Sequence, residues 1–135
     1  MERLQIAPPY SQFFLTDAGD ETFDPSFTPL PVQARPRGIC VATLMWQDGA
    51  MVVDLALDEA LDVAPDAATA FEGSIETPSR ELVLYDPDRT VYWRRRVDAS
   101  QVRLRIWAND TSEPTYIAIL VESLPRLSRG PRDAD

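Results

Sequence analysis

The chain has 135 residues, 44% of them hydrophobic, which is enough for one domain with a core and too few to expect two. It contains 22 acidic and 13 basic residues, a single cysteine and no histidine. The absence of histidine removes the commonest general acid–base side chain near neutral pH and excludes a serine–histidine–aspartate triad. One cysteine excludes an internal disulfide, and Cys40 lies in an apolar run that predicts a buried free thiol.

The net charge of −9 is unevenly distributed along the chain. Residues 1–88 hold 16 acids and 4 arginines, a net charge of −12, whereas residues 89–135 hold 6 acids and 9 arginines, a net charge of +3. An acidic surface disfavours nonspecific nucleic-acid binding and favours docking on a basic partner. The alternative is that these acids only keep the protein in solution.

The first elements in chain order are a short edge strand at 4–7, ended by prolines, and a strand at 10–16 with aromatic residues on both faces. Residues 17–37 carry several prolines and little periodicity, which predicts a long surface loop. A calcium site in this loop is an alternative, because hard cations take carboxylate ligands, but the acids do not follow EF-hand spacing.

Two apolar runs, 38–46 and 50–57, flank Asp48-Gly49 and predict a β-hairpin, because tight hairpin turns need positive φ. Residues 58–64 are either a helical turn or an acidic loop, stopped by Pro65. A weaker strand follows at 69–76, with a bulge expected at Gly73.

A second hairpin is predicted from 80–85 and 90–97 across a proline-containing turn. Residues 101–108 alternate apolar and polar side chains, typical of a half-buried strand, and 115–122 are apolar almost throughout, which predicts a central strand covered on both sides. Together these elements predict an all-β fold, an antiparallel β-sandwich of about eight strands. Residues 1–123 would form a single domain and 124–135 a flexible C-terminal tail.

Catalytic motifs are harder to find. Asp54, Ala56 and Asp58 share one strand face, and paired carboxylates on one face are a pattern found in glycosidases, although a solvated strand face gives the same pattern. The arginines at 94–96 alternate between faces and therefore form no single nucleic-acid patch; ion pairs with the acidic half are expected instead. No catalytic residue, metal or cofactor is predicted. The N-terminus lacks secretion-signal features and no apolar run is long enough to span a membrane, so we expect a cytoplasmic protein.

Three short segments carry a family resemblance: Tyr10-Ser11-Gln12-Phe13, the alternating strand that ends with Trp107, and Pro114-Thr115-Tyr116-Ile117. Their order and spacing resemble the competence protein J family, whose members inhibit a DNA-degrading nuclease. The resemblance covers about residues 5 to 123 and matches less well in the middle of the chain. Its signature positions in this sequence are Tyr10, Gln12, Phe13, Trp107, Thr115 and Tyr116.

The resemblance implies a small bacterial protein that binds a nuclease without being an enzyme. Carboxylates suit that role, because a nuclease site built for phosphates also attracts other anions. The expected partner-binding acids are Asp17, Asp20, Glu21, Asp24, Asp58, Glu59 and Asp62. Two alternatives stay open: a protein-interaction or regulatory β-domain with a non-nuclease partner, and a metal-dependent hydrolase that uses Asp54, Asp58 or the loop acids.

Overall fold

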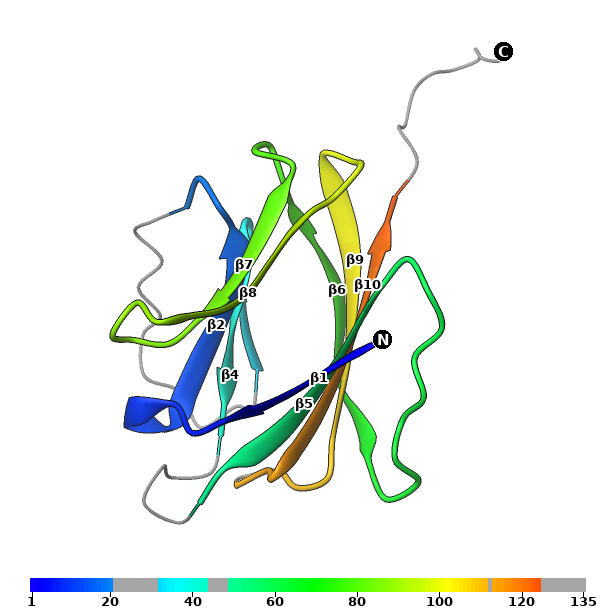
Figure 1. Cartoon of the computed structure of the whole chain (residues 1–135). Helices are drawn as coiled ribbons and strands as arrows, with labels where there is room; N and C mark the ends of the chain where they lie inside the picture. The colour runs from blue at the N-terminus through cyan, green and yellow to red at the C-terminus, as the bar shows by residue number, and fades with distance from the viewer. Residues whose placement is uncertain (21–31, 44–48, 112, 125–135) are drawn as a thin grey trace.

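Two five-stranded sheets face each other in a computed structural model that describes residues 1–20, 32–43, 49–111 and 113–124 (Figure 1). In spatial order the first sheet contains β1 (Glu2–Ile6), β5 (Met51–Leu57), β10 (Tyr116–Ser123), β9 (Gln101–Ala108) and β6 (Ala68–Glu76). The second contains β3 (Val32–Arg35), β4 (Gly38–Ala42), β2 (Gln12–Asp17), β7 (Glu81–Tyr85) and β8 (Val91–Arg96). One 3₁₀ turn, η1 (Pro9–Ser11), joins β1 to β2. The predicted all-β sandwich is confirmed, with ten strands in the described ranges instead of about eight.

The predicted centre of the fold is also confirmed. β10 lies in the middle of the first sheet between β5 and β9, and its residues 117–119 are buried on both faces. In β9 the alternate residues 102, 104, 106 and 108 are buried, as the two-residue period predicts. The sheet is not wholly antiparallel, because β5 and β10 run parallel while β10 and β9 run antiparallel.

The predicted hairpin across Asp48-Gly49 is wrong. β4 and β5 belong to different sheets, so the connection between them crosses the sandwich. Both edges of β4 are taken by β2 and β3, and both edges of β5 by β1 and β10. Residues 44–48 lie outside the described ranges. The second predicted hairpin is confirmed, because β7 pairs with β8.

Three smaller predictions need correction. Tyr10 lies in η1 and not in the strand that follows it, which begins at Gln12. The predicted loop 17–37 includes the end of β2 and all of β3, while residues 21–31 lie outside the described ranges. The bulge in β6 lies between Thr69 and Phe71 and not at Gly73, where the Phe71 ring covers the glycine.

The core lies between the sheets. Leu15, Ile39 and Leu84 from the second sheet and Val53, Leu104 and Ile119 from the first belong to one cluster of buried side chains. Each such side chain contributes about 1.5–3 kcal/mol when fully buried, so this cluster is the main source of stability. A smaller cluster on the outer face of the second sheet contains Cys40, whose predicted burial is confirmed and raises its thiol pKa to about 12.

Two of the three arginines of β8 form the expected ion pairs with acids. Arg94 forms an ion pair with Glu81 (3.1 Å), and Arg95 reaches across to Glu2 on β1. The second pair ties the edge of one sheet to the edge of the other.

The described part of the chain contains no helix long and apolar enough to cross a membrane. The same residues include no group of three or more cysteine, aspartate or glutamate side chains placed to hold a metal ion.

Candidate functional site

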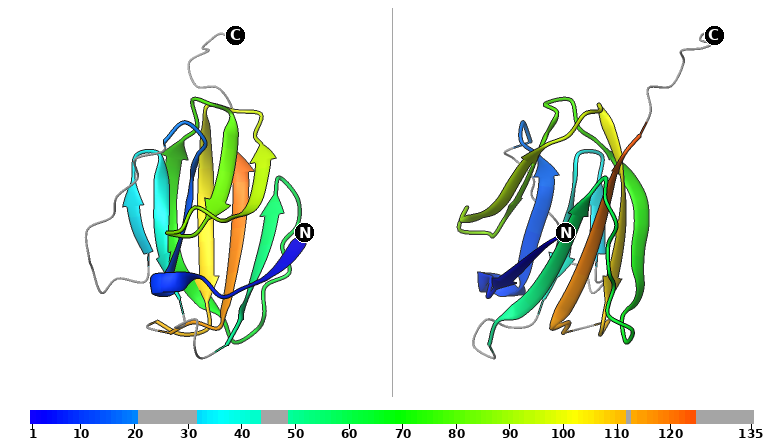
Figure 2. Two further views of the ribbon diagram at one scale, coloured as in Figure 1. Left: turned by 60° about the vertical axis from the view of Figure 1, so that its left-hand side comes forward. Right: turned by 45° about the vertical axis from the view of Figure 1, so that its right-hand side comes forward.

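The segment between β5 and β6 forms an acidic loop, residues 58–67, that crosses the outer face of the first sheet (Figures 1 and 2). Its acids are Asp58, Glu59, Asp62 and Asp66, and it has no basic residue. Of the two structures expected for 58–64, the loop is the one observed. It covers the outward-facing residues Asp54, Ala56 and Ala118, which are therefore buried although they lie opposite the core.

A buried carboxylate anchors the middle of the acidic loop. Asp54 has no solvent exposure and accepts two hydrogen bonds from Arg3, Nε to Oδ1 at 2.7 Å and Nη2 to Oδ2 at 2.9 Å. The Tyr116 hydroxyl donates to Asp54 Oδ2 at 2.9 Å and accepts from the Ala64 N–H of the loop at 3.3 Å. Hydrogen bonds from Arg3 lower the pKa of Asp54 against the opposing effect of burial, so Asp54 is ionised at neutral pH.

A second anchor holds the start of the loop. Asp58 has a left-handed backbone (φ 53°), and its carboxylate accepts from the Ser123 N–H (2.7 Å) and the Ser123 hydroxyl (2.6 Å). Glu59 pairs with the amino group of Met1 at 2.7 Å. Asp62 and Asp66 are exposed and make no ion pair or hydrogen bond through their carboxylates within the described ranges. Of the predicted docking acids on this loop, Asp58 and Glu59 therefore help to hold the loop, whereas Asp62 faces solvent.

A groove of about 590 Å³ lies between the acidic loop and the sheet. Leu61, Val63 and Leu120 are among its apolar lining, and Trp107 closes it on the β9 side. Its lining residues are Asp58, Glu59, Ala60, Leu61, Val63, Arg105, Trp107, Leu120, Glu122 and Ser123. Apolar walls with carboxylates along the edge suit a side chain that has an aliphatic stem and a cationic end.

The arginine in this lining is already engaged. The Arg105 guanidinium lies 5.2 Å from the centre of the Trp107 ring, and its Nε is 3.4 Å from Glu72 Oε2. Arg105 thus shows within the protein that a guanidinium can lie over the Trp107 ring beside a carboxylate.

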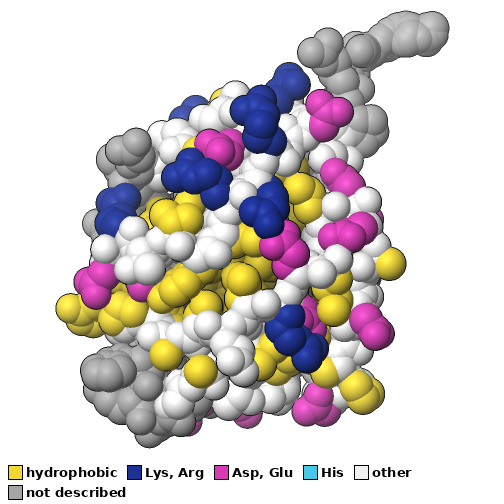
Figure 3. All heavy atoms as spheres, viewed as in Figure 1, with side chains coloured by type: hydrophobic (Ala, Val, Ile, Leu, Met, Phe, Trp, Pro, Cys, Tyr) yellow, Lys and Arg dark blue, Asp and Glu magenta, His cyan; other side chains and the backbone are white. Residues whose placement is uncertain are grey.

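Charges are unevenly distributed over the face drawn in Figure 3. Figure 3 shows acidic side chains along the margin where Figure 1 places the acidic loop, and arginines gathered over the β8 side. Segment 89–96, which holds β8, has four arginines and no acid. A basic partner would therefore approach from the acidic-loop side.

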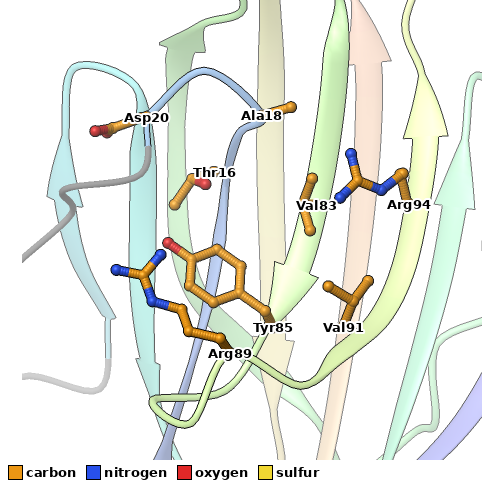
Figure 4. A pocket seen from close by; sticks show the side chains of 8 residues that line it. All are labelled: Thr16, Ala18, Asp20, Val83, Tyr85, Arg89, Val91 and Arg94. Atoms are coloured by element: carbon orange, nitrogen blue, oxygen red, sulfur yellow. The ribbon is translucent and has the colours of Figure 1, made fainter.

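The second sheet carries a smaller pocket of about 190 Å³ on its outer face (Figure 4). Asp20, Tyr85, Arg89 and Arg94 are among its lining residues. The Arg89 guanidinium lies 5.6 Å from the centre of the Tyr85 ring, and burial raises the pKa of the Tyr85 phenol. Because Glu81 pairs with Arg94 and Asp20 offsets the remaining arginine, this pocket has little net charge and is a poorer docking surface than the groove.

The acids predicted to dock from 17–24 do not form a surface patch in the described residues. Asp17 is fully buried, where its carboxylate accepts from the N–H groups of Gly19 and Ser79, each at 3.0 Å, and is closed to a partner. Asp20 lines the small pocket of the second sheet, and Glu21 and Asp24 lie outside the described ranges.

The signature residues lie in three different places in the fold. Trp107 and Tyr116 belong to the groove and to the anchor beneath the acidic loop. Phe13 is fully buried in the core, and Gln12 accepts a hydrogen bond from the Cys40 thiol at 3.2 Å. Two signature residues lie in connections between strands: Tyr10 is exposed on η1, and Thr115 is held by Asn109 before β10.

Sequence reasoning missed Arg3, Leu120 and Glu122 as parts of this site, and treated Asp54 as a candidate catalytic acid. One signal was available: an acid inside the apolar run of β5 needs a cationic partner if it is buried. Asp54 is buried and paired with Arg3, whereas the exposed Asp58 carboxylate accepts hydrogen bonds from Ser123.

No family model and no curated protein matches this sequence. Among solved structures, the chain is similar to ComJ from Bacillus subtilis, described as an inhibitor of the DNA-degrading activity of NucA. The TM-score is 0.68 at 10% sequence identity, and the match covers 92% of this chain and 96% of ComJ. The two proteins thus share a fold across nearly their whole lengths.

Proposed function

We propose that this protein is a non-enzymatic inhibitor that binds a DNA-degrading nuclease through the groove and its acidic loop. The fold shared with ComJ over 92% of the chain carries the proposal, because ComJ is an inhibitor of this kind. The groove supports it independently, since its apolar walls and carboxylate edge suit the basic residues with which a nuclease holds DNA.

Inhibition would follow from competition for the cations of the nuclease. The exposed carboxylates of Asp62 and Asp66 on the acidic loop, together with Glu122 in the groove lining, would pair with cations that otherwise bind phosphates. Trp107 and Leu120 would supply apolar contact. The anchors below the loop fix it before binding, which reduces the entropy lost on association.

The test is DNA cleavage by NucA, and by nucleases from the source organism, at rising concentrations of the purified protein. We expect stoichiometric inhibition and a complex detectable by titration calorimetry at low salt. Two results together would support the regulatory β-domain instead. The protein would inhibit none of the nucleases tested, and the complexes recovered from the source organism would contain only proteins that are not nucleases.

The surface is tested by charge reversal. We expect Asp62→Arg with Glu122→Arg to weaken inhibition at least about 10-fold, because one exposed carboxylate of the acidic loop and one carboxylate of the groove lining become cations. The matched control is Asp88→Arg with Glu113→Arg, which makes the same change of net charge at exposed sites outside the groove lining. Equal loss in both variants would show that only net charge matters and would refute the groove as the docking site.

A further inference from the structure

The turn η1 holds two strained residues in succession. Tyr10 has φ 60° and ψ 19°, and Ser11 has φ 55°, both in the left-handed region. An L-residue in this conformation costs roughly 1–2 kcal/mol, whereas glycine adopts it without penalty. The chain therefore places a bulky aromatic residue at a position where glycine would be more stable.

The surrounding structure imposes this conformation. Pro8 and Pro9 restrict the backbone on one side, and on the other the Thr43 N–H donates to the Ser11 carbonyl at 2.9 Å. Gln12 immediately enters the β2–β4 pairing opposite Ala42. None of these contacts requires an aromatic side chain at position 10.

The side chain of Tyr10 contributes little to the stability of the fold, because the residue is 72% exposed. In the described residues the other large exposed apolar side chains are Met1 and Val91, so Tyr10 is the aromatic among them. Strain that persists without a folding benefit is characteristic of functional positions, and tyrosine is enriched among the residues that dominate protein interfaces.

The position of Tyr10 allows one partner to contact it together with the acidic loop. β1 runs between the two regions, with the Met1 amine paired to Glu59 at one end and η1 at the other (Figure 1). Nine extended residues span at most about 32 Å, which is an upper limit for the distance from Met1 to Tyr10. A standard interface of roughly 800 Å² on each partner has about this width.

We propose that Tyr10 is a second contact point for the same nuclease, with its ring inserted into an apolar slot that offers an acceptor to the phenol hydroxyl. This inference rests on the proposed function and adds to it a contact away from the acidic groove. The left-handed backbone would project the ring outward, and its strain is the cost of that placement.

The experiment measures thermal stability and nuclease affinity for four variants. Tyr10→Gly should raise the melting midpoint by roughly 2–4 °C, through relief of strain, and weaken binding at least about 30-fold. Tyr10→Ala should lose the same affinity. Tyr10→Phe should stay within about 10-fold of the wild type, because it keeps the ring and loses one hydrogen bond.

Ser11→Gly is the matched control, because it relieves the same kind of strain next to an intact tyrosine ring. We expect a higher melting midpoint with unchanged affinity, which separates loss of the ring from added backbone freedom. A Tyr10→Gly variant that melts several degrees lower would identify Tyr10 as a structural residue and overturn the inference.

The outcomes also separate this inference from the proposed function. If Tyr10→Gly and Tyr10→Ala bind as the wild type does while Asp62→Arg with Glu122→Arg weakens binding, the Tyr10 contact is refuted and the groove stands. If the wild-type protein binds no nuclease, both fall together, whatever the stability of the Tyr10 variants.

Discussion

At the scale of single residues, Tyr116 contributes to the site from beneath the surface. Its hydroxyl joins the buried Asp54 carboxylate to the Ala64 N–H, so one phenol connects β5, β10 and the acidic loop. This geometry gives a signature residue a physical role that its exposure alone would not reveal.

Tyr116→Phe removes that hydroxyl and leaves the ring in place. We expect a loss of about 1–3 kcal/mol in unfolding free energy, because a buried carboxylate loses a donor. Hydrogen exchange at the Ala64 amide should become faster, and nuclease affinity should fall as the loop loosens. Tyr10→Phe removes an exposed hydroxyl and serves as the stability control; equal exchange at Ala64 in both variants would contradict the anchoring role.

The Arg3–Asp54 pair makes stability depend on pH in a defined direction. The folded-state pKa of Asp54 is lowered, first by hydrogen bonds from Arg3, so the pair stabilises above the unfolded pKa of about 3.9 and this contribution is lost as pH falls through the folded pKa. Arg3→Ala should therefore be less stable than the wild type at pH 7, with a difference that shrinks below about pH 4. Urea unfolding at pH 7, 4 and 3 measures the unfolding free energies, with Arg103→Ala, a change at an exposed arginine, as the control. A difference between the wild type and Arg3→Ala that stays constant with pH would contradict the coupling between Asp54 ionisation and stability.

At the scale of the elements, the close approach of β2 and β4 depends on Gly38. A Cβ at this position would lie 2.5 Å from Thr16 Cγ2 and 3.1 Å from the Leu15 carbonyl oxygen, which is fixed in the strand pairing. We expect Gly38→Ala to cost about 1–3 kcal/mol by overpacking, with a lower denaturant midpoint and an unchanged denaturant slope. Stability equal to the wild type would mean that the two strands separate at little cost.

Local patterns predicted the strands better than they predicted their partners. The alternation of 101–108 and the apolar run of 115–122 identified β9 and β10, because the burial of each strand face determines which of its side chains are apolar. The choice of partner strand produces no comparable pattern of apolar and polar residues. Asp48-Gly49 therefore predicted a hairpin, although β5 pairs instead with β1 and with β10, more than 60 residues later.

The same distinction separates the predicted site residues from the candidate site in the structure. Asp58, Glu59 and Asp62 were predicted from charge alone, and the structure places them on one loop beside Trp107. Asp17 carries the same charge but is buried as an acceptor of backbone N–H groups. Composition cannot distinguish an acid that is exposed to solvent from one that accepts hydrogen bonds from the backbone of a turn. The environment of an acid depends on the segments that pack against it.

At the scale of the whole molecule, the separation of charge predicts how association responds to salt. With a net charge of −9 and an acidic loop on one side, the protein would be attracted electrostatically toward the proposed basic nuclease, and dissolved salt would screen this attraction. We expect the association rate constant to fall at least about 10-fold between 50 and 300 mM NaCl, with a much smaller change in the dissociation rate constant. Stopped-flow mixing measures both rate constants. If salt changed only the dissociation rate constant, electrostatic steering of the association would be excluded.

The position of β10 in the first sheet limits which strand pairings can form while the chain is being synthesised. β10 is the strand between β5 and β9, yet it is the last strand in the described sequence, so the middle of the first sheet is filled only after both neighbours have been synthesised. Contacts of such high sequence separation slow folding, because a long loop must close before the contacts stabilise it. A nascent chain on the ribosome would thus hold β5 and β9 with open edges, and inhibition would begin only when β10 closes the sheet and brings Tyr116 beneath the acidic loop.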